Sequence, residues 1–142
     1  MTAAPFASTF VAIALIPVAF LFLHAFRSGK GKRRFHPVTG FAAVAWDLSV
    51  SIGYMIYRTV GGSVNGETLN LSPAMNLYFM VVHVPIAVVV MSLELTVLAT
   101  GFWQLKIRHP VRFHSKLTLP LFYIWWFAFL SGEVLYILMY VI

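Results

Sequence analysis

Four long apolar stretches follow one another along the chain, and three shorter polar segments separate them. The apolar stretches occupy residues 9–26, 38–57, 74–102 and 117–142. A helix needs about 20 apolar residues to cross the hydrocarbon core of a bilayer, and each stretch is close to that length or longer. The pattern predicts an all-α integral membrane protein with a single membrane domain, residues 1–142, in which four transmembrane helices form a bundle.

The basic residues fall almost entirely in two of the polar segments. Nine of the ten Lys and Arg residues lie in segments 27–37 and 104–116, and the other is Arg58. Lys and Arg gather in loops on the cytoplasmic side of a membrane, so both segments are predicted to be inner loops. The glycine-rich segment 58–73 is then the outer connection. Short connections favour an antiparallel bundle, which places both termini on the outer side.

Composition excludes several classes of function. The chain is 61% hydrophobic, 16% aromatic and only 10% charged, so its net charge of +6 has no soluble face on which to form a nucleic-acid site. The absence of cysteine excludes disulfides, thiolate metal ligands and c-type haem attachment. No nucleophile motif or phosphate loop is present, and we therefore expect no enzyme activity. We expect residence in a prokaryotic cytoplasmic membrane, in contact with the lipid bilayer.

Four ionisable side chains lie inside the predicted spans: Asp47, His83, Glu94 and Glu133. Such a group costs about 2.5 to 3.5 kcal/mol near the middle of a membrane helix unless it faces protein or water, so we expect all four to face other helices. At about 1.5 Å of rise per residue, Asp47 lies roughly 14 Å and Glu94 roughly 12 Å from the inner ends, and the two carboxyl groups are expected to share a proton. His83 and Glu133 fall in the outer half, within reach of each other.

Three further histidines at the inner boundary are candidate ligands. His36 opens the second helix, His114 opens the fourth, and His24 lies near the end of the first. Neutral imidazole binds haem iron, copper or zinc, and facing helices of a bundle can supply both ligands. These residues predict a site for haem b or for a metal ion of undetermined identity. The structural alternative is an interfacial histidine bonded to water, headgroups or a carbonyl, which we favour for His109 and weigh more heavily for His24 than for His36 and His114.

Three segments resemble a known family of small four-helix membrane proteins, catalogued as domain of unknown function 420. The similar segments are residues 36–58, 78–87 and 114–140. The family pattern has a histidine at the start of its second helix, one inside its third and one at the start of its fourth, as His36, His83 and His114 stand here. After the last histidine the pattern continues with residues that this chain also has: Ile124, Trp125, Ser131, Gly132 and Tyr136.

The resemblance implies a role in the respiratory chain, because some members of that family are maturation factors for haem-copper oxidases of the aa3 type. We therefore expect an accessory membrane protein, either an assembly factor or a small subunit of such an oxidase complex. Two alternatives follow from the residues themselves. One is a haem b-binding electron carrier that uses His36, His114 and His24, and the other is a proton or ion path along Asp47 and Glu94.

The fourth apolar stretch is aromatic around its whole circumference. Six aromatic residues fall within residues 122–129, and on a helix they cannot all face the bundle interior. Outward-facing rings either contact lipid or pack against another membrane protein. We predict a docking face for a further protein of a respiratory complex, formed by Phe122, Trp125, Trp126 and Phe129.

Overall fold

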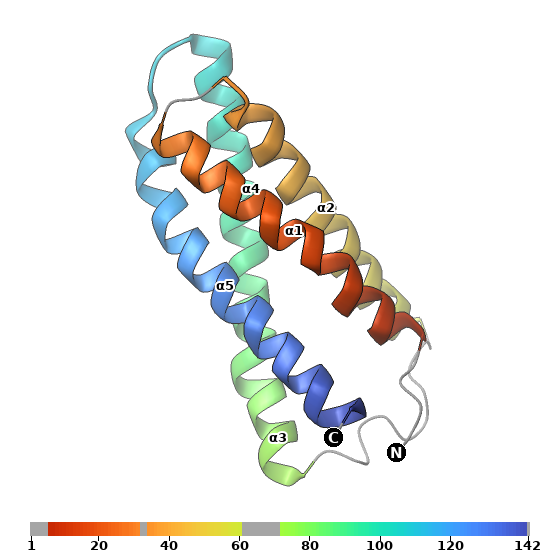
Figure 1. Cartoon of the computed structure of the whole chain (residues 1–142). Helices are drawn as coiled ribbons and strands as arrows, with labels where there is room; N and C mark the ends of the chain where they lie inside the picture. Colours follow the sequence, from red (N-terminus) through yellow and green to blue (C-terminus); the bar gives the residue numbers. More distant parts are fainter. Residues whose placement is uncertain (1–5, 32–33, 61–71, 142) are drawn as a thin grey trace.

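The computed structural model is a bundle of long helices (Figure 1). It describes residues 6–31, 34–60 and 72–141, and the following concerns these alone. The elements in chain order are α1 (Phe6–Lys30), α2 (His36–Thr59), α3 (Pro73–Tyr78), the π-helical turn η1 (Phe79–His83), α4 (Val84–Ile107) and α5 (Arg112–Tyr140). Elements α3, η1 and α4 follow one another without a break and form one span, Pro73–Ile107.

Four helical spans in the described part of the chain are long and apolar enough to cross a membrane: α1, α2, Pro73–Ile107 and α5. The all-α membrane class and the number of spans agree with the sequence prediction. In Figure 1 the ends of α1 and α4 and the beginnings of α2 and α5 lie together at the top. We call this the basic end, because the two segments rich in Lys and Arg lie there.

The helices extend further into the basic segments than the sequence pattern predicts. Helix α1 continues to Lys30, so much of the predicted loop 27–37 is helical. Helix α4 ends at Ile107 and α5 begins at Arg112, which leaves only a short connection within the predicted loop 104–116. Lys and Arg are good helix formers, and their charges interact favourably with the C-terminal ends of α1 and α4. The limit of the apolar stretch is therefore not the limit of the helix.

The connection between α4 and α5 is tight. Arg108 ends α4 in the left-handed conformation, with φ of 54°, as is common where an α-helix stops. The side-chain Oε1 of Gln104 accepts a hydrogen bond from the backbone N–H of Val111 at 3.0 Å. This bond closes the turn and sets the first residues of α5 beside the last turns of α4.

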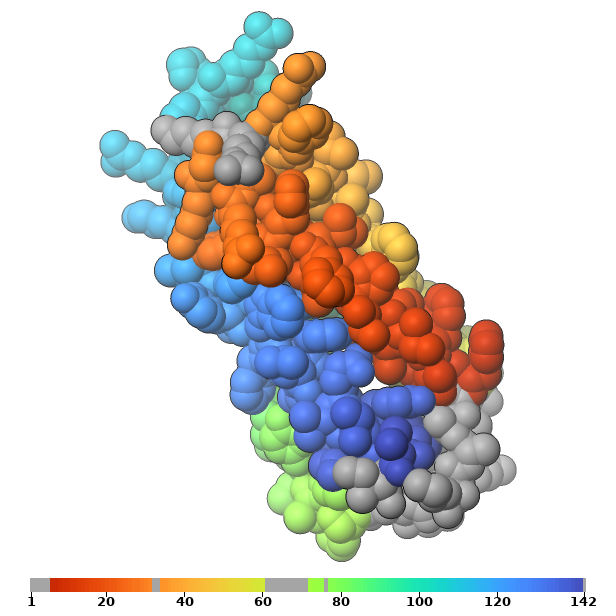
Figure 2. Space-filling model, viewed as in Figure 1, coloured from red at the N-terminus to blue at the C-terminus, as the bar shows by residue number. Residues whose placement is uncertain are grey.

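The core lies where α1, α2, α4 and α5 meet. Its buried residues are Val18, Ala19, Phe22, Ala43, Val44, Val90, Leu121 and Trp125. Phe22 stacks on Trp125 with ring centroids 4.3 Å apart, and Phe26 stacks on Phe122 at 4.0 Å. Helix α1 therefore packs closely against α5, and Figure 2 shows the two helices adjacent on one face of the molecule.

The structure corrects the docking face that the sequence predicts on α5. Trp125 is only 2% exposed, so it cannot contact another protein. The other three predicted residues are partly buried and lie against neighbouring rings: Phe122, Trp126 and Phe129. Within residues 122–129, the rings that point outward are Tyr123, at 64% exposure, and Phe127, at 50%. Stacking on Phe26 and Phe22 of α1 turns Phe122 and Trp125 inward.

A π-helical turn interrupts the third span between α3 and α4. Pro85 has no N–H to donate, and its ring conflicts with the carbonyl of Val81 one turn earlier. The wider turn relieves this conflict, because the N–H of Val84 bonds instead to the carbonyl of Phe79, five residues before it. The turn ends at His83, so the imidazole is presented from an irregular part of the helix.

Candidate functional site

His36 is held in place by the last turns of α1. Its Nδ1 lies 2.9 Å from the carbonyl oxygen of Ala25, and because a carbonyl only accepts, Nδ1 must carry the proton and donate. The ring lies over Gly29, where a Cβ atom would come within 2.8 Å of Cε1. A glycine is therefore needed for this close approach. The remaining ring nitrogen, Nε2, keeps its lone pair for a ligand.

His114 is held in the same manner by α4. Its Nδ1 lies 3.1 Å from the carbonyl oxygen of Val97 and 3.2 Å from Oγ1 of Thr100. The Thr100 hydroxyl donates to carbonyls of its own helix, so Nδ1–H of His114 is the donor in both contacts. A Cβ atom on Gly101 would lie 3.2 Å from Cε1 of this ring. Nε2 of His114 is again the nitrogen with a free lone pair.

The two histidines thus repeat one arrangement in two neighbouring helix pairs. Each ring crosses a glycine of the preceding helix and donates to the carbonyl one helical turn before that glycine. Hydrogen bonds of this kind fix the tautomer and orientation of an imidazole and raise its basicity as a ligand. The sequence does not identify Gly29, Gly101 or Thr100 as part of a site. The feature of the sequence that could have indicated them is a glycine near the end of the helix that precedes each histidine.

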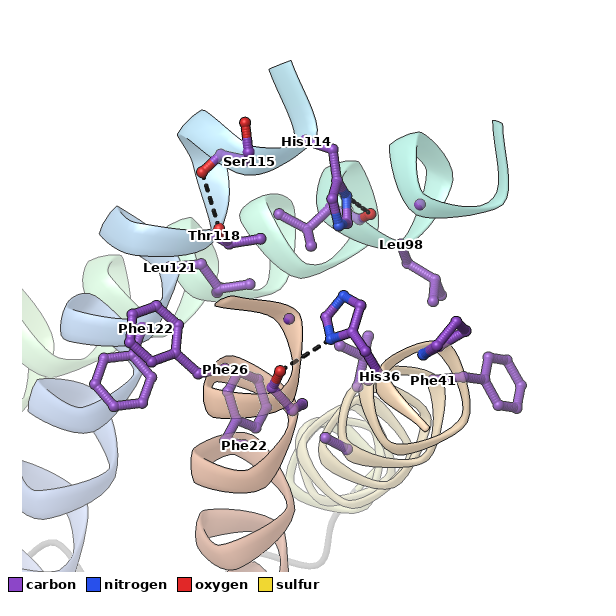
Figure 3. A pocket seen from close by; sticks show the side chains of 18 of the residues that line it. Phe22, Phe26, His36, Phe41, Leu98, His114, Ser115, Thr118, Leu121 and Phe122 are labelled. Atoms are coloured by element: carbon purple, nitrogen blue, oxygen red, sulfur yellow. Dashed lines mark hydrogen bonds between the residues drawn. The ribbon is translucent and has the colours of Figure 1, made fainter. Parts of the chain in front are cut away.

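The two imidazoles face each other across a cavity at the basic end (Figure 3). Their ring centroids are 6.1 Å apart with an interplanar angle of 68°, and the nitrogens that make no hydrogen bond point toward each other. The cavity has a volume of about 450 Å³, within the range of small-molecule and cofactor sites. Its walls are largely aromatic and aliphatic, and they include Phe22, Phe26, Phe41, Leu98, Phe102 and Phe122.

The spacing of the histidine pair, His36 and His114, fits a metal centre held from two opposite sides. A nitrogen at about 2.0–2.1 Å from the metal, with its ring centre roughly 1 Å further away, gives a centroid separation of about 6 Å across that metal. The observed separation is 6.1 Å. A tetrahedral ion needs further donors, and the described residues contain no group of three or more His, Cys, Asp or Glu that could supply them. Axial ligation of a haem needs only these two nitrogens.

Asp47 and Glu94 meet in the core, as their predicted common depth implies. Glu94 on α4 is 0% exposed and Asp47 on α2 is 4% exposed. The two carboxyl groups interact electrostatically, and the indole of Trp125 lies close to Asp47. Neither carboxyl oxygen of Glu94 has a hydrogen bond of good geometry within the described part of the chain. We call these two residues the acid pair.

His83 occupies a different place, far along the bundle from the basic end. Its Nδ1 lies 3.0 Å from Oγ of Ser131 on α5, and its ring stacks on Phe79. Gly132 leaves room for the ring, since a Cβ atom there would be 3.2 Å from Cε1. The hydrogen bond described for His83 goes to Ser131, and no interaction between His83 and Glu133 is found within the described part of the chain. Glu133 is itself partly buried.

His24 is not a third ligand of the cavity. Its side chain is exposed, and it does not contribute to the cavity wall. The physical reason is its place on the helix. At about 100° per residue, His24 lies on the side of α1 opposite to the residues that line the cavity, which include Phe22, Phe26 and Gly29. His109 is also exposed, in the connection between α4 and α5.

The interpretation of this site rests on its own geometry: two oriented imidazoles, a common cavity and apolar walls. The histidine pair was among the sequence candidates, and the acid pair was predicted as a unit. Comparison with known proteins does not extend this picture. No family model matches the chain, and no curated protein or solved structure matches it either.

Proposed function

We propose that this chain is a membrane protein that binds one haem b between His36 and His114. The observation that carries the proposal is the pair of free Nε2 atoms that face each other, with ring centroids 6.1 Å apart. His36 and His114 would both be occupied in holding the haem iron, and a haem held in this way would supply electron transfer rather than oxygen chemistry. The chain supplies both ligands and an apolar cavity, and the function that this arrangement supports best is that of a membrane electron carrier.

Charge at the cavity supports a haem in preference to a bare metal ion. Lys30 lines the cavity, and its Nζ lies 4.5 Å from the centroid of the Phe26 ring. The propionate groups of haem are anionic, and a cation at the basic end attracts them. Aromatic walls suit the flat faces of the macrocycle. A small hydrated cation would gain nothing from either feature.

We further propose an antiparallel arrangement in the membrane, with the basic end inside and both termini outside. The first turn of α1 contacts the far ends of two other helices. Ser8 lies 3.1 Å from the hydroxyl of Tyr54, and Thr9 lies 3.0 Å from the hydroxyl of Tyr136. The excess of Lys and Arg at the basic end supports a cytoplasmic location for that end of the haem site, in a prokaryotic cytoplasmic membrane.

An optical titration tests the haem proposal. The protein, purified in detergent, is titrated with haemin and then reduced with dithionite. We expect a Soret band that saturates at one haem per chain and a sharp α band after reduction. Replacing His36 or His114 by alanine should abolish this spectrum, whereas the matched control His109→Ala should keep it. A protein that forms no Soret band with excess haemin would refute the proposal, and binding of zinc or copper alone would identify a metal-ion site instead.

The wider setting that we propose is an accessory role in the respiratory chain, as an assembly factor or a small subunit of a haem-copper oxidase complex. The family resemblance of His36, His83 and His114 supports it, and a membrane haem site suits such a partner. Deleting the chain should lower the oxidase absorbance and the oxygen uptake of host membranes. Affinity purification should recover an oxidase subunit. Unchanged membranes and no recovered subunit would exclude this setting without affecting the haem titration.

A further inference from the structure

The acid pair lies next to the cavity, on the side away from the basic end. Asp47 interacts with the indole of Trp125, so α2, α4 and α5 meet at this level. The residues one helical turn nearer to the basic end on these three helices all line the cavity: Val44, Val97 and Leu121. A helical turn rises about 5.4 Å, so only one layer of side chains separates the acid pair from the floor of the cavity.

His114 connects the cavity to the same part of α4. Its Nδ1–H donates to the carbonyl of Val97, and Val97 lies one turn from Glu94. His114, a proposed haem ligand, is therefore hydrogen-bonded to the segment of α4 that carries Glu94. At this short range and in an apolar interior, a change of charge in the cavity has a strong electrostatic effect on the protonation of the acid pair.

Among the residues that the structure describes, no cation interacts with the acid pair. At this level α1 presents Val18 and Phe22, and α5 presents Trp125, none of which is charged. The other titratable groups on the packed helices lie toward the two ends of the bundle: His36 and His114 at the cavity, and His83, Glu133, Tyr54 and Tyr136 toward the opposite end. Two adjacent carboxylates cannot both remain ionised without a cation, so the pair must hold a proton.

We propose that the acid pair takes up a proton when the haem site takes up an electron. This inference rests on the proposed haem function and adds a role for Asp47 and Glu94. When a one-electron donor reduced a haem held by His36 and His114, the ionised carboxylate of the pair would gain one proton from solvent and become a carboxylic acid. The two charges balance, and on oxidation the electron and the proton both leave. The pair acts as a proton-accepting group beside the redox centre, not as a ligand.

The pH dependence of the reduction potential tests this coupling. In the haem-loaded protein we expect the potential to fall as pH rises, by up to about 59 mV per tenfold change in proton concentration for a one-electron step. The isosteric double variant Asp47→Asn/Glu94→Gln, which leaves no carboxyl group in the pair, should flatten this slope while keeping the Soret band. Glu133→Gln is the matched control, because it removes a partly buried carboxyl away from the cavity, and it should keep the slope of the unaltered protein.

An infrared difference spectrum gives a readout that does not depend on a variant. The reduced-minus-oxidised spectrum of the unaltered protein should contain a carboxyl C=O band. A Soret band with a pH-independent potential and no carboxyl band would overturn this inference and leave the haem proposal intact. A slope that persists in the double variant Asp47→Asn/Glu94→Gln would also overturn it. Failure of the unaltered protein to bind haem would overturn both proposals together.

Discussion

His83 and the histidine pair use the same local arrangement but have different surroundings. Each ring lies over a glycine of a neighbouring helix, and each donates from Nδ1 to that helix. His36 and His114 then present Nε2 into a shared cavity. His83 stacks on Phe79 beside the π-helical turn and has no second imidazole opposite it.

This difference shows what distinguishes a histidine that can bind a ligand from one that only packs between helices. A glycine contact and a hydrogen bond orient the ring in all three places, and at His83 that is a structural role in helix packing. Only at the basic end do two oriented rings converge from different helices on one cavity. The convergence of two rings, and not a histidine by itself, therefore indicates a ligand site. Three substitutions, at two glycines and at Ser131, distinguish the ligand role of His36 and His114 from the packing role of His83.

The largest effect is expected for Gly29→Ala. The new Cβ atom would lie 2.8 Å from Cε1 and 2.9 Å from Nδ1 of His36, so the ring must leave its position. We expect haem affinity to fall at least tenfold, or about 1.4 kcal/mol, in the haemin titration. Helix propensity favours alanine over glycine by up to about 1 kcal/mol, so the protein should remain folded. Gly53→Ala is the control, since no atom lies within 4 Å of its Cβ position. Equal affinities in both variants would contradict the role of Gly29.

A smaller effect is expected for Gly101→Ala. Here the added Cβ atom would lie 3.2 Å from Cε1 and 3.6 Å from Nδ1 of His114, so a shift of a few tenths of an ångström relieves the contact. We expect a loss of haem affinity of a few fold, or roughly 0.5 to 1 kcal/mol. Gly132→Ala makes the comparable contact with His83 at 3.2 Å and should leave haem affinity unchanged. An equal loss in the two variants would mean that the effect is not local to the histidine pair.

The smallest effect is expected for Ser131→Ala, which removes the hydroxyl that accepts the 3.0 Å hydrogen bond of His83. Hydrogen bonds between membrane helices average about 0.6 kcal/mol, so the thermal midpoint should fall only slightly. The haem spectrum and the reduction potential should not change. A shift of the Soret band in Ser131→Ala would show that the His83 region and the cavity are coupled, and it would remove the distinction drawn here between a structural and a ligand histidine.

Several features were accessible from the sequence because they depend on local pattern. The four apolar stretches predict four spans, since a bilayer requires a minimum apolar length whatever the packing of the helices. The common level of Asp47 and Glu94 follows from the constant rise of a helix and from knowing where each span begins. Helix ends were less accessible, because Lys and Arg extend α1 and α4 beyond the apolar pattern.

What the sequence by itself determined is the set of membrane helices, their polar positions and the shortlist of ligand histidines. Tertiary structure alone decided which of these side chains meet. His24 and His36 look equivalent along the chain, yet the rotation of α1 against α2 excludes the first and orients the second. The rotation of α5 against α1 likewise turns Trp125 inward, onto Phe22. Helix rotation depends on contacts between residues distant in sequence, and no periodicity within a single helix records it.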